Sequence, residues 1–341
     1  MTQSHMAREV AEVPEAAARF LSLSGQAVGR AAAAMRAIDP ELVVTVARGS
    51  SDHAATYLKY AVELLAGVPV ASVGPSIASV YRRPLRLGAA VCLGISQSGR
   101  SPDIVEMMRA AGEGRALSIA VTNDAASPMA MVCAHCLPLQ AGAERSVAAT
   151  KTFVLSVLAG LSLLAEWQQD ESLRAAVQGF PALSARALAL DWATLSDRLV
   201  RAQSLFVLGR GPAFAIANEA ALKFKETCGL HAESYSAAEV LHGPSALVQA
   251  RFPVLALGVA DAALPQVEAT ATQLVAQGAD VFLTGGAVPG AVTLPHLTGL
   301  HPLIAPLLQA VTFYGFIEAL ARRRGYDPDT PPHLRKVTET V

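Results

Sequence analysis

The sequence predicts an α/β protein made of two tandem doubly wound parallel-sheet domains related by internal duplication. Three observations support this fold class. The chain has 341 residues, enough for about two domains of ordinary size, and 52% of them are apolar. Short apolar runs alternate with helical patterns, which is typical of parallel strands buried on both faces. Finally, two long segments of the chain resemble each other.

The repeated segments begin with an arginine-glycine pair that follows an apolar strand. "ARGSSDHAATYLKYAVELLAG" spans residues 47–67, and "GRGPAFAIANEAALKFKETCG" spans residues 209–229. Both segments continue into a helical run that ends at glycine. An offset of 162 residues aligns Arg48 with Arg210, and the same offset pairs Gly67 with Gly229, Ser72 with Ser234, Glu106 with Glu268, and Thr122 with Thr284. The repeat predicts the same order of strands and helices in both copies.

The elements of the first copy follow from its apolar runs. Strands are predicted near 42–47, 68–72, 90–95, 117–122 and 136–139, with helices near 52–66, 102–112 and 150–167. The segment near 170–200 is interpreted as polar helices broken at Pro181, because proline cannot donate the hydrogen bond that a helix interior needs. We therefore place an N-terminal helix and the first domain at 1–180, the second domain at 190–324, and a C-terminal tail at 325–341.

Charge and hydropathy exclude several classes of protein. The net charge is −1 without a block of like charge, so neither nucleic acid nor a membrane is expected as a partner. The N-terminal residues lack the basic and apolar regions of a signal peptide. The longest apolar stretch, 153–167, is shorter than the ~20 residues that span a bilayer. We expect a cytoplasmic protein that binds a small molecule.

A pair of cysteines, Cys133 and Cys136, encloses His135. One such pair supplies only half of a structural zinc site. The pattern is therefore compatible with small apolar residues at a buried strand edge and also with metal or redox chemistry.

A hydroxyl-rich loop is predicted after the third strand of the first copy. Segment 94–103 reads "GISQSGRSPD", whereas the corresponding segment of the second copy, 257–266, reads "LGVADAALPQ". Gly99 permits close backbone approach, and a helix that starts near Pro102 directs its N–H groups to the same place. An ordinary turn with a helix N-cap is the alternative. The candidate phosphate ligands are Ser96, Gln97, Ser98 and Ser101, with further hydroxyls from Arg48-Gly49-Ser50-Ser51 after the first strand.

A cluster of acids and bases is predicted in the second copy. On a helix near 212–228, Glu219, Lys223 and Glu226 are spaced by four and three residues and therefore share one face. The helix is otherwise rich in apolar residues, so we expect these charges to be buried for a purpose; an exposed Glu–Lys ladder is the alternative. His242 precedes Gly-Pro in a loop, where an imidazole either transfers protons or is simply exposed.

Three segments, in this order along the chain, resemble one known family. They are "SQSG" after a strand, "EAALKFKE…HAESYSAAEVLHGP", and "PPHLRKVT" near the end. They resemble the sugar isomerase (SIS) domain family, and especially its two-domain members similar to the isomerase half of glucosamine-6-phosphate synthase and to stand-alone glucosamine-6-phosphate deaminases. The resemblance covers nearly the whole chain and implies flavodoxin-like domains that bind a phosphorylated amino sugar.

The resemblance also implies how the phosphate is held. In the family, the serine-rich loop binds the phosphate of the sugar, which implies this role for Ser96, Gln97, Ser98 and Ser101. Ser51, from the loop after the first strand, is implied to join them. No metal and no organic cofactor are implied.

Roles in proton transfer are likewise implied by the resemblance. Glu226 would move a proton between C1 and C2, and His242 would help to open the sugar ring. In the family this histidine comes from the partner subunit, which implies a homodimer. Lys223 and Lys336 would line the site near the sugar and its amino group, and Glu239 falls on an acidic position of the family.

The sequence departs from the synthase pattern in ways that bear on function. Arg100 and Ser101 stand where that pattern has an acid and a threonine, and Leu241 stands where it has a lysine. The resemblance begins at residue 6, so we expect the glutamine-hydrolysing domain to be missing. The expected function is therefore deamination of glucosamine 6-phosphate or galactosamine 6-phosphate to a ketohexose 6-phosphate. Alternatives are another aldose–ketose isomerase or deglycase of the family, and a sugar-phosphate sensor without catalysis.

Overall fold

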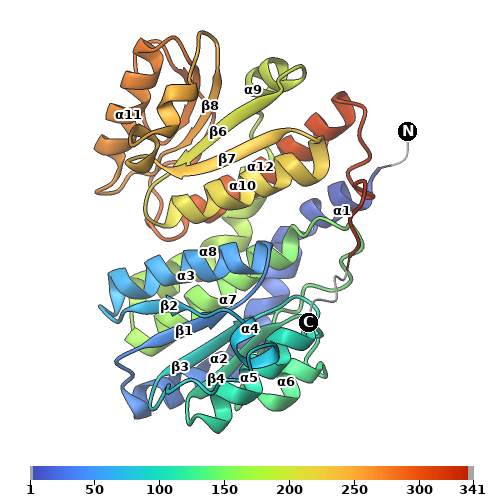
Figure 1. The fold of residues 1–341 in the computed structure, drawn as a ribbon, viewed down its shortest axis with the longest axis vertical. Coiled ribbons are helices and arrows are strands. Elements are labelled where there is room, and N and C mark those ends of the chain that lie inside the picture. The colour runs from blue at the N-terminus through green and yellow to red at the C-terminus, as the bar shows by residue number, and fades with distance from the viewer. Residues whose placement is uncertain (1–2, 337–341) are drawn as a thin grey trace. The chain divides into compact units, whose positions relative to one another are not determined.

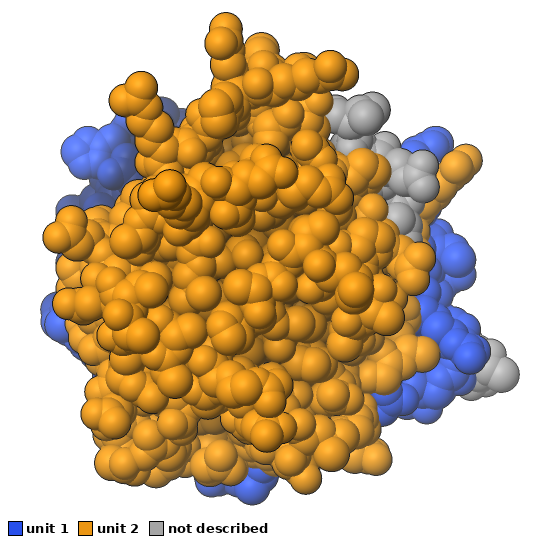
Figure 2. Space-filling model, turned by 90° about the horizontal axis from the view of Figure 1, so that it is seen from below, with its two compact units in different colours: residues 1–13, 145–150, 182–334 blue, residues 14–144, 151–181, 335–341 orange. Residues whose placement is uncertain are grey.

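The computed structural model describes residues 3–336, so residues 337–341 of the predicted tail lie outside the described residues. Two compact units make up the chain, coloured blue and orange in Figure 2. Unit 1 comprises residues 1–13, 145–150 and 182–334, and unit 2 comprises residues 14–144, 151–181 and 335–341. The units are interleaved along the chain, whereas the boundaries expected from the sequence are linear and stay a prediction.

Unit 2 contains a five-stranded parallel sheet. Its strands are β1 (Val43–Val46), β2 (Val70–Ser72), β3 (Val91–Ile95), β4 (Leu117–Thr122) and β5 (His135–Pro138). All five predicted strands are confirmed to within two residues at each end. The strands lie in the order β2-β1-β3-β4-β5 (Figure 1), which is the flavodoxin-like order.

Helices cover both faces of this sheet. Successive residues of a strand point to opposite faces, so neighbouring residues of β1 contact different helices. Val43 of β1 lines a small internal cavity with Met35 and Leu58, whereas Val44 packs in a cluster with Ile104 and Met108. The first face is covered by α2 (Val13–Ile38), α3 (Ser50–Leu65) and α7 (Lys151–Gln168), and the second by α4 (Ser76–Ser79), α5 (Pro102–Glu113) and α6 (Pro128–Val132). The doubly wound fold predicted for the first copy is confirmed.

Unit 1 repeats this topology. Its strands are β6 (Ser204–Gly209), β7 (His231–Ser236), β8 (Pro253–Leu257), β9 (Asp280–Thr284) and β10 (Val292–Thr293). Their order is β7-β6-β8-β9-β10, which matches the order in unit 2. Val43 pairs with Val70 in unit 2, and Leu205 pairs with Ala232 in unit 1, so the register repeats at the offset of 162 residues. The tandem fold predicted from the repeat is confirmed.

The first helix of each copy begins with the same backbone conformation. Gly49, before α3, has φ 55° and ψ −133°, and Gly211, before α10 (Pro212–Cys228), has φ 59° and ψ −138°. Glycine adopts this region readily, whereas other residues are strained there. Each strand therefore turns into its helix in the same way, which places Ser50 and Pro212 at equivalent positions.

Helices also cover both faces of the second sheet. Phe224 of α10 packs against Phe313 of α12, with ring centroids 5.3 Å apart. On the opposite face, Val267 of α11 packs in a cluster with Phe206 of β6. The remaining elements of this unit are α9 (Ala193–Leu199), η1 (Glu239–Leu241), η2 (Pro244–Leu247), α11 (Leu264–Ala276) and α12 (Ala305–Arg323).

Helix α8 (Glu171–Leu188) runs through Pro181 without a break. The prediction of helices broken at this proline is wrong. Proline removes one backbone hydrogen bond from a helix, but α8 also buries an apolar stripe. The residues of this stripe are each at most 2% exposed and follow one another at spacings of four, three and seven: Leu173, Val177, Phe180 and Ala187. Packing of this stripe therefore outweighs the local preference of the proline.

The short helix α1 (His5–Ala11) is tied to the C-terminal tail within unit 1. Ser4 caps the helix by accepting a bond from Ala7 N at 2.9 Å. The carboxylate of Asp329 accepts bonds from His5 N at 2.7 Å and from Met6 N at 2.8 Å. A negative charge is favourable at a helix N-terminus. The negative charge at the N-terminus of α1 is therefore supplied by Asp329, in the C-terminal tail.

No helix within residues 3–336 has both the length and the apolar character needed to cross a bilayer.

Candidate active site

The loop after β3 has a backbone that its own hydrogen bonds hold in place. Ser96 Oγ accepts a bond from Gly99 N at 3.2 Å, and Gly99 O accepts one from Met129 N at 3.0 Å. Gly99 has φ 61°, and a Cβ at this position would lie 2.2 Å from Ser127 Oγ. Only glycine fits there. The loop ends at Ser101, the N-cap residue of α5.

The fold makes little use of the hydroxyls in this loop. Ser101 precedes α5 without a capping bond from its side chain, and Ser98 Oγ accepts only a long bond of 3.4 Å from Arg100 N. In the first turn of α5, Pro102 has no N–H group, Ile104 N bonds Asp103 Oδ1 at 2.9 Å, and Val105 N bonds Ser101 O at 3.0 Å. The loop gathers the four predicted ligands, and Ser51 lies in the first turn of α3, after the neighbouring strand β1.

In the corresponding loop of unit 1, a backbone carbonyl group accepts hydrogen bonds from side chains of the same unit. Gly258 O, just after β8, accepts bonds from Gln309 Nε2 at 2.6 Å and from Thr284 Oγ1 at 3.3 Å. Helix α11 begins after Ala263, which has no side-chain donor or acceptor. The two copies therefore differ at this strand end as their sequences do.

An ion pair joins the loop after β1 to the start of α5. Arg48 Nε and Nη2 lie 2.7 Å and 2.5 Å from Asp103 Oδ2, and Ile104 N donates to Asp103 Oδ1 at 2.9 Å. The Asp103 side chain is fully buried, whereas that of Arg48 is 47% exposed. Asp103 was not among the predicted site residues. The available signal was an acid in the first turn of the helix that follows the serine-rich loop.

Arg48 also affects a second acid, Asp52 in the first turn of α3. Burial raises the pKa of Asp52 above its ordinary value, against the charges of His53 and Arg48, which lower it. The net effect is a raised pKa.

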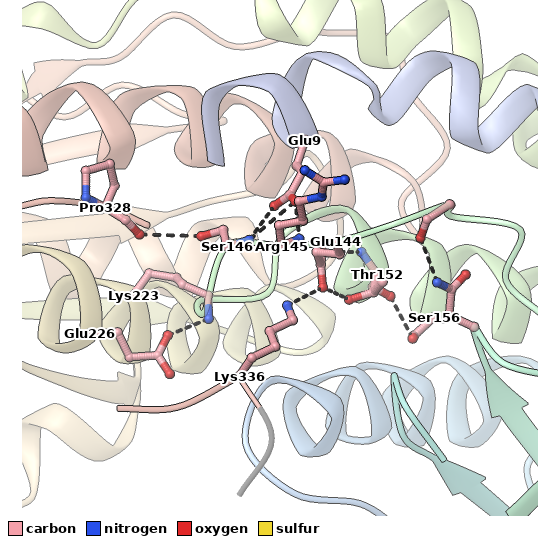
Figure 3. A network of polar contacts seen from close by, with 12 residues as sticks. Glu9, Glu144, Arg145, Ser146, Thr152, Ser156, Lys223, Glu226, Pro328 and Lys336 are labelled. Carbon is pink, nitrogen blue, oxygen red and sulfur yellow. Dashed lines mark hydrogen bonds and ion pairs between the residues drawn. The ribbon is translucent and has the colours of Figure 1, made fainter. Parts of the chain in front are cut away.

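The three charged residues predicted on α10 form one buried network. Lys223 Nζ lies 2.6 Å from Glu226 Oε2 and 3.3 Å from Glu219 Oε1, and Tyr314 donates to Glu219 Oε1 at 2.9 Å. The side chains of Lys223 and Glu219 are at most 1% exposed, whereas that of Glu226 is 21% exposed. Figure 3 shows Lys223 directed at the Glu226 carboxylate. The three residues are largely buried and paired with one another, so they do not form the alternative, an exposed Glu–Lys ladder.

The network fixes the charge of its lysine. Burial alone would lower the pKa of Lys223, but the charges of Glu219 and Glu226 outweigh it and raise the pKa above its usual value. Lys223 thus stays protonated and holds the Glu226 carboxylate by a charge-assisted hydrogen bond. The buried ammonium of Lys223 is thus fixed between the carboxylates of Glu219 and Glu226.

His242 and Glu239 lie in an exposed turn after β7. Glu239 begins η1, and His242 N donates to Glu239 O at 2.9 Å. Gly243 follows with φ 135°, and both side chains are exposed, together with those of Leu241 and Leu247. Within residues 3–336 the structure gives neither Glu239 nor His242 a side-chain hydrogen bond. In this turn, one histidine and two apolar side chains are therefore exposed at the surface of unit 1.

The tail lysine is paired with a buried acid in unit 2. Lys336 Nζ lies 3.0 Å from Glu144 Oε2, and Thr152 donates to the same carboxylate through N at 3.0 Å and Oγ1 at 2.7 Å (Figure 3). Burial would raise the pKa of Glu144, but the charge of Lys336 and the bonds from Thr152 hold it below its ordinary value. Glu144 was not predicted. An acid seven residues before the long apolar helix α7 gave no distinctive signal.

The cysteines are arranged as apolar groups. Cys133 and Cys136 pack against the core of unit 2. Burial raises the pKa of Cys92 and Cys133 to about 12 and that of Cys228 to about 11, and it also raises the pKa of Cys136. In the part of the chain that the structure describes, no three His, Cys, Asp or Glu side chains form a group that could hold a metal ion. The packing favours the apolar interpretation of the pair.

Two matching α/β units, with a hydroxyl-rich loop in one and a Glu–Lys–Glu network in the other, define a two-domain α/β protein. A family model described as SIS domain matches residues 38–165 and 198–284. The chain belongs to the SIS domain family, so the resemblance inferred from its motifs is confirmed.

Curated relatives match nearly the whole chain. Glutamine--fructose-6-phosphate aminotransferase [isomerizing] of Mycobacterium tuberculosis is 32% identical over 97% of the chain and 57% of its own length. The protein of the same name from Aeropyrum pernix is 34% identical over 98% of the chain and 57% of its own length. The chain thus spans little more than half the length of these relatives.

Solved structures share the same fold. A protein from Silicibacter pomeroyi described as a phosphosugar isomerase is 55% identical, with a TM-score of 0.93 over 96% of this chain and 100% of that chain. The C-terminal domain of glucosamine-fructose-6-phosphate aminotransferase from Francisella tularensis is 25% identical, with a TM-score of 0.86 over 97% and 99%. Glucosamine-6-phosphate deaminase from Thermotoga maritima is 20% identical, with a TM-score of 0.81 over 99% and 100%, and shares the fold.

Proposed function

We propose that the protein converts glucosamine 6-phosphate or galactosamine 6-phosphate into a ketohexose 6-phosphate and ammonia. The observation that carries the proposal is the network on α10, in which a buried lysine holds the partly exposed carboxylate of Glu226. A positioned carboxylate suits transfer of a proton next to a carbonyl group. Lys223 orients this carboxylate and does not itself contact the substrate.

The reaction balances as a hydrolysis. The open-chain aldehyde gives up its C2 proton to Glu226 while its O1 oxygen takes a proton from a general acid, which leaves an enolamine. Glu226 then gives the proton to C1 while the amino nitrogen loses one. The product of this step is an imine at C2. Water adds to the imine carbon and ammonia leaves, so an amino sugar phosphate and water give a ketose phosphate and ammonia.

Other residues serve the steps on either side of proton transfer. His242 would protonate the ring oxygen and open the sugar, and the exposed turn that carries it suits a histidine offered to the partner subunit of a homodimer. Glu239 lies one turn earlier and is the second acid of this segment. Lys336, fixed by Glu144, would lie near the amino group.

The serine-rich loop would hold the phosphate. The hydroxyls of Ser98 and Ser101 are little used by the fold and would donate to the phosphate oxygens. Ser51, Ser96 and Gln97 would complete the set. The proposal requires that this loop and Glu226 act on the same substrate, in one chain or in a dimer.

Two observations support an amino sugar and its deamination. The names of the relatives, fructose-6-phosphate aminotransferase and glucosamine-6-phosphate deaminase, join a hexose 6-phosphate to a reaction of an amino group. The four cysteines of the sequence all have raised pKa values, so none is activated to release ammonia from glutamine.

A coupled assay tests the proposal. Purified protein is incubated with glucosamine 6-phosphate, galactosamine 6-phosphate, or fructose 6-phosphate with ammonium, and ammonia and ketose phosphate are measured. We expect equal amounts of ammonia and ketose phosphate from at least one amino sugar phosphate. Interconversion of neutral hexose phosphates without ammonia would instead identify an aldose–ketose isomerase. Binding of phosphosugars without any turnover would identify a sensor.

A further inference from the structure

The strand order of unit 2 reverses between β1 and β3, and doubly wound sheets bind ligands at this switch point. The loop after β1 contains Arg48, and the loop after β3 leads into the first turn of α5, which contains Asp103. The ion pair between them therefore crosses the switch point. A charged pair at this position is placed to meet a ligand.

The geometry of the pair holds the guanidinium in one orientation. Nε and Nη2 of Arg48 both approach Asp103 Oδ2, and Asp103 Oδ1 is fixed by the backbone of Ile104. A guanidinium has five N–H donors in one plane. Since the pair with Asp103 uses Nε and Nη2, the Nη1 edge of the half-exposed side chain remains for another acceptor.

A phosphate dianion is held more strongly by a positively charged donor than by neutral groups alone. The hydroxyls of Ser98 and Ser101 are neutral donors, and hydrogen bonds from a charged donor are about twice as strong. Arg100, the other cation of these two loops, is 62% exposed and paired with Asp124 at 3.0 Å. Arg48 is less exposed and has a buried anchor, which makes it the better placed cation.

We propose that Arg48 binds the substrate phosphate through its Nη1 edge, with Asp103 as the residue that positions it. The inference rests on the proposed phosphate site and adds to it the residue that selects a doubly charged group. Arginine matches the geometry of phosphate with a planar fork, which lysine cannot reproduce. Arg48 thus makes the protein discriminate between phosphorylated and unphosphorylated sugars.

A purely structural role for Arg48 is the competing explanation, since a buried carboxylate such as Asp103 needs a partner. Three variants separate the two explanations. Arg48→Gln removes the charge of the guanidinium and leaves the buried Asp103 side chain in place. Asp103→Asn keeps the charge of Arg48 but removes its anchor. The double variant Arg48→Gln with Asp103→Asn restores a neutral, mutually hydrogen-bonded pair and therefore preserves folding even where Arg48→Gln alone does not fold.

The control is Arg109→Gln. Arg109 lies on the same helix as Asp103, pairs with Glu106 at 2.9 Å, and has the same 47% side-chain exposure as Arg48. Dissociation constants for inorganic phosphate, glucosamine 6-phosphate and fructose 6-phosphate are measured by calorimetry on the full-length protein. Glucosamine, which lacks the phosphate, is included as the probe without an anionic group.

We expect the double variant and Arg48→Gln to bind all three phosphates about 10- to 100-fold more weakly than wild type, because one charge-assisted bond is lost. Asp103→Asn should show a smaller loss, and Arg109→Gln none. Wild-type affinity in the double variant would overturn the inference and leave the proposed function intact. A wild-type protein that binds none of the phosphates would overturn both. Turnover is not needed for this comparison.

Discussion

The ammonium of Lys336 and the carboxylate of Glu144 lie 3.0 Å apart, although 192 positions separate the two residues in the sequence. The Glu144 side chain is fully buried, and Lys336 retains 24% exposure. A fixed and buried partner gives the last described residue of the chain a defined position. Glu144 therefore belongs with the candidate site residues.

The first prediction concerns pH and the variant Glu144→Gln. The pKa of Glu144 is lowered in the folded protein, so its ionised form contributes stability above the ordinary value of 4.5, and this contribution is lost as pH falls through the folded pKa. We expect the difference in free energy of unfolding between wild type and variant to be largest near neutral pH and to shrink below 4.5. Urea unfolding across this range measures it.

The matched control for Glu144 is Glu171→Gln, because the Glu171 side chain is 82% exposed. This variant should differ little from wild type at every pH. A Glu144→Gln difference that stays constant on acidification would show that ionisation of Glu144 does not stabilise the fold.

The second prediction is that Glu226→Gln binds substrate but turns it over 10²- to 10⁴-fold more slowly, the usual range for loss of a general base. The amide keeps the shape of the side chain while it removes the base. Binding is measured by protection against thermal unfolding. In heavy water, wild type should incorporate deuterium at C1 of the ketose, and the variant should not. Normal incorporation would move the base to another carboxylate, with Glu239 as the next candidate.

The third prediction concerns the double variant Ser98→Ala with Ser101→Ala. The fold makes little use of these hydroxyls, so stability should change little, while KM rises by about tenfold or more per lost bond to phosphate. The phosphate is remote from the reacting carbons, so kcat should fall much less than KM rises. Thr272→Ala, in which an exposed hydroxyl is lost from α11, is the control. An unchanged KM would place the phosphate elsewhere.

The fourth prediction is a loss of stability in Lys223→Met. Removing the lysine leaves the buried carboxylate of Glu219 without its cation, and breaking a buried pair costs about 3–5 kcal/mol. Lys225→Met, on the exposed side of the same helix, should cost less than about 0.5 kcal/mol. Chemical denaturation of both variants makes the comparison. Equal losses in the two would show that the network does not stabilise α10.

The fold was predictable because both of its signals are local and repeated. Runs of apolar residues such as those at β1 and β3 mark strands buried on both faces, and the offset that aligns Arg48 with Arg210 predicts the second topology from the first. Pro181 is the exception. Its local preference is for a break, and the packing of Leu173 and Phe180 that overrides it cannot be read from neighbouring residues.

The candidate site was predictable to the extent that its residues lie in short segments. Glu219, Lys223 and Glu226 share a helix face, so their spacing predicts the network. Asp103 and Glu144 each meet a partner from a distant segment, Arg48 and Lys336. Sequence spacing carries no information about such pairs until the strand order and the path of the tail are known.

The bonds from His5 N and Met6 N to Asp329 have a consequence for genetics and protein engineering. Asp329 lies seven residues before Lys336. A bulky group attached close to His5 would therefore disturb the segment that leads from Asp329 to Lys336. Substitutions around His5 and at Asp329 should give the same phenotype, and a second-site suppressor of one should be sought at the other.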